Sequence, residues 1–572
     1  MSSEVYMEKV FEAAIATELG NALGWDKGLS NGYRPDLGLD TGELFTFIGA
    51  TQKRAFDKLI TAYGDLPTAQ REFAARVASE IDKRGALDVL RNGVRDRGAT
   101  IQLCYFRPGH TLAASALDDY NANRLTVVRQ LRYSAKTQDE LDLTLFVNGI
   151  PIATAELKNP LTGQDVESAK KQYRTDRDPK ELIFARRTLV HFFAVDPHLV
   201  FFVTTRLAGA ETRFLPFNVG THGPGRSGGA GNPPADDGDY QTSYLWRQVW
   251  QRDNFLDLLH RFVHVAVPKK GRPNPHSSPM VFPRFHQWHA VREMTRHALR
   301  EGAGHNYLIE HSAGSGKSNT IAWLAHRLST LHDAGSKPVF DKVIVITDRV
   351  VLDRQLQHTI YQFDHVPGVV KKIDEDAQQL AAALTGATSR VIITTLQKFP
   401  FILDKVSQLA DQRYAVIIDE AHSSQSGESA NALKKALGRL GSTRSTTTAI
   451  RLPRRRWRVA STPTCPTSRS PPPRSRRRLR SSGPVARTPA TWGRFTSTRC
   501  GRPSTRLHPR RAAQLHHLRG ALAPRQRGRR SGRVRRSRGR PQEGQGQAGT
   551  RRGAAPGVAR SAGADHRRAL PQ

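Results

Sequence analysis

The chain has 572 residues, enough for several domains, with 38% hydrophobic residues and a formal net charge of +37. Residues 441–572 hold 34 arginines, no lysine and two acidic residues, which leaves 54 basic and 49 acidic residues in 1–440. The C-terminal part therefore carries +32 and the remainder +5. Only the tail has the charge typical of a segment that binds a polyanion, whereas the rest is typical of an ordinary soluble α/β protein.

The cysteines and the apolar runs of the sequence indicate in which cellular compartment the protein is expected. Cys104, Cys465 and Cys500 show neither metal-ligand spacing nor a disulfide framework, which favours a reducing environment. The N-terminal sequence MSSEVYMEKVFEAAI is acidic and amphipathic, unlike a signal peptide. Apolar runs near 183–203 are interrupted by charged residues and histidines, so they predict buried strands rather than a membrane span. We therefore expect a cytoplasmic protein without membrane contact.

Hydrophobic periodicity divides the chain into four parts. Residues 1–205 alternate helical and strand patterns, with strands in ARRTLVHFFAV and HLVFFVTT. Residues 206–280 are expected to be a flexible linker rich in Gly, Pro and Asp with a bridging helical stretch. Residues 281–440 alternate strands such as KVIVIT, RVIITT and YAVIID with helices, as in a parallel α/β sheet. Residues 441–572 lack this rhythm and are expected to be a disordered tail.

The first part contains the stretch DELDLTLFVNGIPIATAELKNP, whose alternation predicts two strands joined at Asn148-Gly149. A plain two-residue turn would leave the carboxylate of Asp142 on the wrong face for pairing with Glu156. A three-residue turn, or a bulge at Pro151, would shift the register by one and set these two acids opposite each other.

In the bulged register, the polar residues of this stretch could form a metal site for attack on a phosphate. Asp142 and Glu156 could hold Mg²⁺, and Lys158, on the same face as Glu156, could steady the attacking water or the developing phosphorane charge. From spacing alone, a solvent-facing charged strand with a Glu–Lys pair is the favoured interpretation, because this pattern is short and promiscuous.

Further along, LIEHSAGSGKSNTIAWLA reads as strand, glycine loop and helix. The turn Gly314-Ser315-Gly316 lets backbone N–H groups face a phosphate, Lys317 supplies a positive charge near the terminal phosphates, and Ser318 can bind Mg²⁺. These five residues predict a phosphate-binding loop.

His311 stands where the strict loop pattern has glycine, so this match alone leaves open a plain turn before a helix. The stretch YAVIIDEAHSSQ makes that alternative less favourable, because two carboxylates directly after a buried strand are costly without a cation. Asp419 is suited to hold Mg²⁺ and Glu420 to orient the hydrolytic water, whereas His422 is more typical of a surface histidine. Together, the two motifs predict an ATPase.

These motifs resemble those of superfamily 2 helicases and translocases, which pair AGSGKS with DEAH. RFHQWHAV looks like the adenine-reading motif of that family, which implies this role for Gln287. VIVITDRVVLDRQL and IITTLQKF resemble motifs that contact the DNA backbone in the family. The resemblance thereby implies DNA contacts for Thr347, Arg349, Thr395 and Gln397.

A more specific resemblance covers about residues 5–440. LFVNGIPIATAELKN, NRLTVVRQLRYS, QYRTDRDPKE and HSAGSGKSNTIAWLAHRL look like the restriction subunit of type I restriction–modification enzymes. The resemblance implies a PD-(D/E)xK nuclease domain followed by a RecA-like parallel α/β motor domain. It implies ATP and Mg²⁺ as cofactors, and double-stranded DNA and separate methylation and specificity subunits as partners, with S-adenosylmethionine required through those subunits. DNA cleavage would use Asp142, Glu156 and Lys158.

The chain departs from this family's pattern at two places. Leu141 precedes Asp142 where the family has proline, and Ala169 stands where the family's Gln-x-x-x-Tyr motif has glutamine, so a role for Tyr173 is left open. Glu12, on the first helix, is a candidate to complete the metal site, although a solvated helix face is the favoured interpretation.

The tail shows no legible motif III, second RecA-like domain or helical C-terminal region. A disordered basic tail that binds nucleic acid by counterion release is one interpretation. However, 34 arginines without a lysine are odd for such a tail, and they suggest GC-rich codons read out of phase. PTCPTSRSPPPRSRR can be encoded by codons that, two bases later, give LSYFAFTATPKSK, which resembles the family's motif III. Our hypothesis is that the reading phase is lost near 440 and shifts again near 506.

Two other functions stay open at this point. One is another nuclease–translocase fusion, such as a stand-alone anti-phage ATPase. The other is a non-enzymatic nucleic-acid-binding protein that acts through its basic tail, which would bind with a steep salt dependence.

Overall fold

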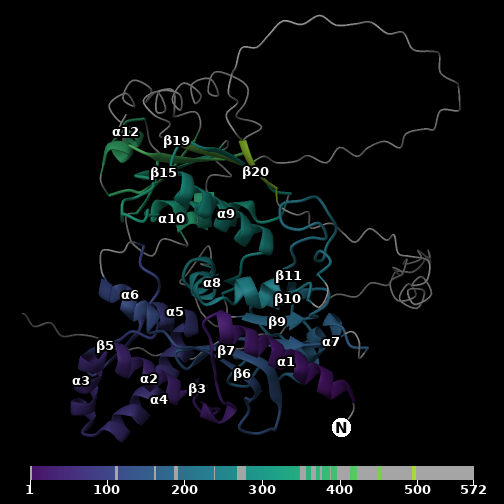
Figure 1. Cartoon of the computed structure of the whole chain (residues 1–572). Coiled ribbons are helices and arrows are strands. Elements are labelled where there is room, and N and C mark those ends of the chain that lie inside the picture. Colours follow the sequence, from purple (N-terminus) through teal and green to yellow (C-terminus); the bar gives the residue numbers. More distant parts are fainter. Residues whose placement is uncertain are drawn as a thin grey trace, which may run out of the picture. The chain divides into compact units, whose positions relative to one another are not determined.

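The computed structural model describes 15 stretches of the chain, all within the compact unit Met1–Ser504 (Figure 1). They are residues 3–109, 114–159, 163–185, 191–236, 239–266, 278–312, 314–347, 356–357, 359–361, 369–373, 377–386, 388–395, 412–420, 447–452 and 492–496.

A seven-stranded mixed sheet organises the N-terminal part. Its order is β1 (Asp26–Lys27), β6 (Leu125–Arg132), β7 (Glu140–Val147), β8 (Ile150–Leu157), β9 (His191–Val195), β10 (Phe201–Thr204) and β11 (Leu215–Pro216). Strands β6 to β8 are antiparallel neighbours, β8 and β9 run parallel, and β9 to β11 are antiparallel again. The strands expected in ARRTLVHFFAV and HLVFFVTT are thereby confirmed within the described residues.

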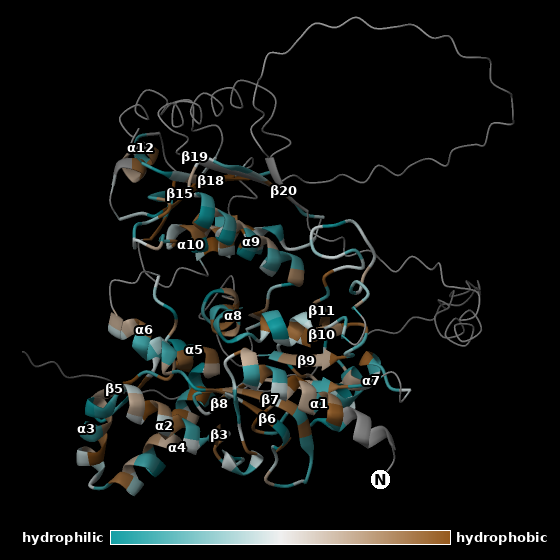
Figure 2. Ribbon diagram, viewed as in Figure 1, coloured by the Kyte–Doolittle hydropathy of each residue, from teal (hydrophilic) through white to brown (hydrophobic). Residues whose placement is uncertain are grey.

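The helices of this part carry apolar stripes that pack into its core. Helix α4 buries Ala69, Phe73, Ala74, Val77 and Ile81, a helical spacing, and its turns alternate between hydrophobic and hydrophilic colours in Figure 2. It begins after Asp65, whose Oδ1 accepts from Thr68 N at 2.8 Å, and ends at Gly85. The helices are α1 (Ser3–Ala22), α2 (Thr41–Thr51), α3 (Lys53–Tyr63), α4 (Leu66–Arg84), α5 (Ala86–Asn92), α6 (Ala114–Asn121) and α7 (Val166–Lys171), with the 3-10 turn η1 (Ser30–Gly32) and the π-helical turn η3 (Gln172–Asp176). Two short antiparallel ribbons are formed by β2 (Tyr33–Arg34) with β3 (Leu39–Asp40) and by β4 (Val94–Asp96) with β5 (Ala99–Ile101).

The β7–β8 hairpin has the bulged register that the sequence left open. Asn148 and Gly149 adopt φ of +51° and +80°, as a tight hairpin turn requires. Phe146 pairs with Pro151, but Leu145 pairs with Ala153, so one extra residue is accommodated between these pairs. A side chain at Gly149 would lie 2.1 Å from Asp40 O, which restricts this position to glycine.

Of the expectations for 206–280, the bridging helical stretch is confirmed, whereas the flexible linker is corrected for the described residues. Its described residues add β11 to the first sheet and continue into the π-helical turn η4 (Leu245–Val249), α8 (Arg252–Asp257), the π-helical turn η5 (Leu258–Phe262) and β12 (His264–Val265), which pairs with β13 (Met280–Val281). Trp246 and Trp250 are buried, and Trp25 Nε1 donates to Trp250 O at 2.5 Å. Because large aromatic side chains tie it to the core, this segment belongs to the packed part of the protein.

A second sheet is parallel throughout, as the sequence predicts. Its order is β16 (Val370–Lys372), β17 (Val391–Thr395), β15 (Lys342–Thr347), β18 (Tyr414–Asp419), β19 (Thr447–Leu452), β14 (Asn306–Glu310) and β20 (Trp492–Thr496). Helices α9 (Phe285–Glu301) and α10 (Lys317–Ser329) pack against each other, and α12 (Ala377–Thr385) contacts β17. The strands predicted in KVIVIT, RVIITT and YAVIID correspond to β15, β17 and β18, which confirms the α/β class.

The expectation of a wholly disordered tail from residue 441 is wrong for two short stretches. Strand β19 lies between β18 and β14, and β20 extends the sheet beyond β14. Both were overlooked because the arginine and proline content of the tail obscures five- and six-residue strand patterns. The remainder of 441–572 lies outside the described residues.

A fully buried histidine makes the first sheet sensitive to acid. His191 is surrounded by the rings of Phe193, Phe255 and Phe282, and neither ring nitrogen has a hydrogen-bond partner among the described residues. Burial lowers its pKa from the ordinary 6.5 to about 3. Because the folded protein cannot accept the proton that the unfolded chain binds, the free energy of unfolding should fall as pH drops below about 6.5, by about 1.4 kcal/mol per unit.

The variant His191→Phe should therefore lose this part of the acid sensitivity. We expect urea midpoints at pH 7.5 and pH 5 to lie closer together in His191→Phe than in the wild type, with exposed His222→Phe as control. An unchanged spread of midpoints in His191→Phe would show that other groups cause the acid dependence.

Among the described residues, every helix is too short or too polar to cross a membrane.

Candidate active sites

Three adjacent strands bring polar side chains into one row across the first sheet. Arg129 pairs with Leu143 and Leu131 with Leu141, which sets Gln130 opposite Asp142.

The next strand extends this row. Since Leu143 pairs with Ala155, Asp142 in turn faces Glu156. Lys158 lies two residues beyond Glu156 and shares its face. The row therefore crosses β6, β7 and β8, and the register that places Asp142 opposite Glu156 is confirmed.

The row is closely packed. Asp142 Oδ2 accepts a hydrogen bond from Leu157 N at 2.7 Å and lies 3.8 Å from Lys158 Nζ. Asp142, Glu156 and Lys158 are each less than a tenth exposed. The solvent-facing charged strand is thus excluded, because all three charged side chains are withdrawn from water.

Glu156 has a partner that the sequence did not reveal. Arg177, just after η3, reaches Glu156 Oε1 with Nη2 at 2.8 Å and Nε at 2.9 Å, and donates to Glu140 O at 2.7 Å. Burial, together with the nearby Asp142 carboxylate, raises the pKa of Glu156 well above its usual range, although Arg177 opposes this. In the described part of the chain, Arg177 is in direct contact with Glu156 Oε1, which leaves the buried Oε2 available to a further cation.

Glu12 is not on a solvated helix face, contrary to the favoured interpretation from the sequence. It is fully buried, and its Oε1 accepts from Gln130 Nε2 at 2.6 Å. Arg129 Nη2 lies 3.5 Å from Glu12 Oε2. Gln130 adopts φ of +50°, an uncommon conformation for a strand residue and one that functional sites often retain. The row is therefore extended towards α1.

Tyr173, on η3, is fully buried beside Phe192 and Phe214. Burial and the Glu156 carboxylate raise its pKa well above the usual range. Ala169, on the preceding turn, is also buried. A catalytic role for Tyr173 stays a prediction.

The row of Gln130, Asp142 and Glu156, the carboxylate row, fits a divalent cation. Glu156 Oε2 is buried and has no hydrogen-bond partner among the described residues, and carboxylate oxygens are the ligands that Mg²⁺ prefers. Asp142 and Glu156 would hold the ion. No group of three or more His, Cys, Asp or Glu side chains in a metal-binding arrangement occurs in the described part of the chain, so water and backbone oxygens would complete the coordination.

Metal binding to this row should release a proton. Because the pKa of Glu156 is raised, its carboxyl keeps a proton at higher pH than an ordinary glutamate, and Mg²⁺ favours the ionised form. Mg²⁺ affinity should therefore rise with pH. Calorimetric titrations in buffers of different ionisation enthalpy should show this release in the wild type and its loss in Glu156→Gln. Heats that do not depend on the buffer in the wild type would contradict the expectation.

The phosphate loop connects β14 to α10. Gly314 and Gly316 have φ of +75° and +87°, a left-handed geometry that glycine adopts without strain. Lys317 begins α10, and its Nζ lies 3.0 Å from Asp419 Oδ1 and 2.5 Å from Glu420 Oε1. The cation that the paired carboxylates require at the strand end is thus supplied by Lys317.

Asp419 and Glu420 adopt a distinctive backbone geometry. Asp419 ends β18 and its Oδ1 accepts from Glu420 N at 2.9 Å, while Glu420 has φ of +51°. Such a non-glycine conformation costs about 1–3 kcal/mol and is common at functional sites. Ser318 lies in the first turn of α10. Its hydroxyl and the Asp419 carboxylate are oxygen ligands that fit Mg²⁺ once a nucleotide engages Lys317.

Gln287 faces the phosphate loop in this structure. Its Oε1 accepts from Arg284 N at 2.8 Å, and its Nε2 donates to Gly316 O at 2.8 Å. The adenine-reading role stays a prediction.

Residues with expected DNA contacts divide into two groups. Thr347 and Thr395 end the neighbouring strands β15 and β17 and are buried. Arg349 and Gln397 lie outside the described residues, as does His422, for which the sequence favoured a plain surface position.

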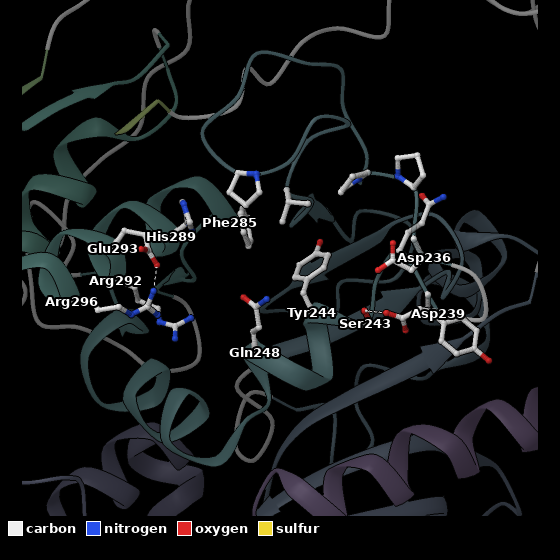
Figure 3. A pocket seen from close by; sticks show the side chains of 17 residues that line it. Asp236, Asp239, Ser243, Tyr244, Gln248, Phe285, His289, Arg292, Glu293 and Arg296 are labelled. Carbon is white, nitrogen blue, oxygen red and sulfur yellow. Dashed lines mark hydrogen bonds and ion pairs between the residues drawn. The ribbon is translucent and has the colours of Figure 1, made fainter. Parts of the chain in front are cut away.

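A pocket of about 600 Å³ opens on a different side of α9 from Gln287. Figure 3 shows Phe285, His289 and Arg292 of α9 facing Tyr244 and Gln248. Its lining includes Phe285 and His289 of the RFHQWHAV stretch but neither Gln287 nor any residue of the phosphate loop or the carboxylate row.

Comparisons with known proteins agree with this two-site arrangement. Residues 6–215 match the family model described as type I restriction enzyme R protein N terminus, and residues 286–456 match the SWI2/SNF2 ATPase model. A type I restriction enzyme endonuclease subunit from Staphylococcus saprophyticus is 24% identical over 437 residues, covering 73% of this chain and 40% of the relative. One from Haemophilus influenzae is 26% identical over 325 residues, covering 54% and 28%.

Among solved structures, the Hef helicase domain of Pyrococcus furiosus matches with 19% identity and a TM-score of 0.24, covering 30% of this chain and 32% of that one. The chain spans less than half the length of the two curated relatives. The two family models follow each other in the order found in the structure, first the carboxylate row and then the phosphate loop. The N-terminal part of the chain is thus similar to that of type I restriction enzyme R proteins, and the curated relatives that match it are endonuclease subunits of such enzymes.

Proposed function

We propose that the chain supplies Mg²⁺-dependent cleavage of double-stranded DNA and ATP binding to a type I restriction enzyme. The observation that carries this proposal is the in-register row of Asp142 and Glu156, with Lys158 on the same face. We assign about residues 1–215 to the nuclease domain and 281–456 to the first half of an ATP-driven motor, which in complete family members moves DNA.

In the carboxylate row, the buried carboxylates would bind Mg²⁺, which supplies a nucleophilic water and neutralises phosphate charge. Lys158 would hold the attacking water or stabilise charge on the phosphorus oxygens. Arg177 and the Leu157 N–H fix the two carboxylates in place. Such charge stabilisation in a water-excluded site commonly raises the rate of the chemical step by about a hundredfold or more.

In the phosphate loop, Gly314, Ser315 and Gly316 would present N–H groups to the nucleotide, and Lys317 would leave Asp419 to contact its terminal phosphates. Ser318 and Asp419 would then hold Mg²⁺, while Glu420 would orient the hydrolytic water.

ATP turnover by this chain should be slow. Motors of this class close ATP between two RecA-like halves, and the second half supplies an arginine finger. The sequence after residue 456 contains no legible second half. We expect ATP to bind, with turnover stimulated little by DNA, in a coupled-enzyme assay with Glu420→Gln as the inactive control. Turnover that DNA raises by orders of magnitude would contradict this.

Partner subunits separate this proposal from another nuclease–translocase ATPase. A restriction subunit should co-purify with methylation and specificity subunits, through which S-adenosylmethionine would act, in the cytoplasm. A stand-alone ATPase should purify without them. A protein acting only through its basic tail should keep its DNA binding in Lys158 and Lys317 variants and lose it without 441–572.

We propose further that the tail is translated out of phase. We keep the hypothesis that the phase is lost near 440 and shifts again near 506; strand β19 and the ATPase match, which reach residues 452 and 456, favour a first change a few residues later. Sequencing of the gene and its transcript from codon 400 onward tests this. An uninterrupted single phase without a long alternative frame across the tail would refute it.

A further inference from the structure

Three side chains hold the back of the phosphate loop. His286 Nε2 lies 3.0 Å from Ser315 O, Gln287 Nε2 lies 2.8 Å from Gly316 O, and His311 Nδ1 lies 3.2 Å from Ser315 Oγ. These contacts fix two consecutive loop residues from two directions, because His286 and Gln287 begin α9 whereas His311 follows β14.

Fixing a carbonyl also aims the next amide. In a planar trans peptide, the C=O and the following N–H point in opposite directions. When Ser315 O is held towards His286, the N–H of Gly316 points away from α9. In the same way, the contact from Gln287 to Gly316 O directs the N–H of Lys317. These are amides of the kind that a phosphate loop offers to its ligand.

Both histidines of this group are buried. His286 and His311 are 7% and 2% exposed, and their rings meet edge to face at 5.2 Å. Burial lowers their pKa values to about 4 and about 3, so both are neutral at physiological pH. Because a carbonyl only accepts, neutral His286 must carry its proton on Nε2.

We infer that His286 and His311 are positioning residues that hold the phosphate loop in its binding conformation before a nucleoside triphosphate binds. This inference rests on the proposed ATP-binding function. A preformed loop avoids the cost of ordering these amides during binding, and it explains why a histidine is accommodated at 311 where the strict motif has glycine. The contacts of His286 and His311 with the loop therefore affect binding of the phosphates, not of the base.

A matched pair of variants tests the donor of His286. His286→Phe keeps a ring but removes the N–H, whereas His286→Gln places an amide N–H at similar reach. With the full chain, affinity for a fluorescent ATP analogue and competition by inorganic pyrophosphate should both weaken about fivefold to tenfold in His286→Phe, the effect of one lost hydrogen bond. His286→Gln should restore binding to within about twofold of the wild type.

A second pair keeps the test decisive if His286→Phe fails to fold. His311→Asn retains a polar group near Nδ1 that can pair with the Ser315 hydroxyl, so it should bind pyrophosphate almost as the wild type does, whereas His311→Leu should bind it more weakly. Wild-type pyrophosphate affinity in His286→Phe and His311→Leu, with binding still weakened about a hundredfold in Lys317→Ala, would overturn the positioning role of the histidines and leave the ATP-binding function standing. Absence of nucleotide binding in the wild type would overturn both.

Discussion

Replacing Lys158 by methionine is expected to slow Mg²⁺-dependent DNA cleavage by about a hundredfold to a thousandfold. Methionine keeps the length and apolar stem of the side chain but removes the ammonium that lies 3.8 Å from Asp142. Metal binding should persist, because Asp142 and Glu156 remain. The rate of nicking of a supercoiled plasmid, and calorimetric Mg²⁺ affinity, measure the two effects separately.

The matched control for this variant is Lys171→Met, which removes a positive charge from the exposed end of α7. It should cleave at the wild-type rate. Equal loss of cleavage in both variants would mean that general charge, such as non-specific attraction of DNA, matters more than the position of Lys158.

Replacing Lys317 by alanine is expected to weaken ATP binding by about a hundredfold, since hydrogen bonds between charged groups are worth about 1.5–3 kcal/mol. In the free protein, Lys317 also neutralises Asp419 and Glu420. Removing it leaves two buried carboxylates side by side, so Lys317→Ala should also melt at a lower temperature than the wild type.

Nucleotide titration by fluorescence and thermal melting measure these two effects. Exposed Lys337→Ala serves as control and should change neither. If Lys317→Ala bound ATP as tightly as the wild type, the loop between β14 and α10 would not be a nucleotide site.

The strands and turn that carry the carboxylate row could be predicted because their geometry is local, although spacing alone favoured a solvent-facing strand. Alternation fixes the strands, Asn148-Gly149 fixes the turn, and Pro151 allows the bulge that sets Asp142 opposite Glu156. The phosphate loop and the acids after β18 were equally legible, because each lies directly at a strand end. Their mutual contact through Lys317 was not predicted, because the sequence assigned Lys317 to phosphate and Asp419 to Mg²⁺.

The partners of these residues could not be predicted, because they come from distant segments without a motif. Arg177 reaches Glu156 from the turn after η3, and Glu12 reaches Gln130 across 118 residues. The left-handed conformation of Gln130 has no sequence signal, since glutamine rarely adopts it. Buried polar networks of this kind depend on tertiary packing, which periodicity does not encode.

The same limit applies to the segment between the two sheets. Its glycine and proline content indicated a linker, but Trp246 and Trp250 anchor it in the core. The tryptophans were the available signal, because aromatic side chains of this size seldom stay in a flexible connector.

The most direct test of the account compares plasmid nicking by the full-length wild type and by Asp142→Asn, each with Mg²⁺ and with excess chelator. We expect nicking by the wild type that requires Mg²⁺, and none above background by Asp142→Asn, whether or not ATP is present. Equal nicking by the two proteins, or none by a folded wild type that binds Mg²⁺, would contradict the assignment of the nuclease site.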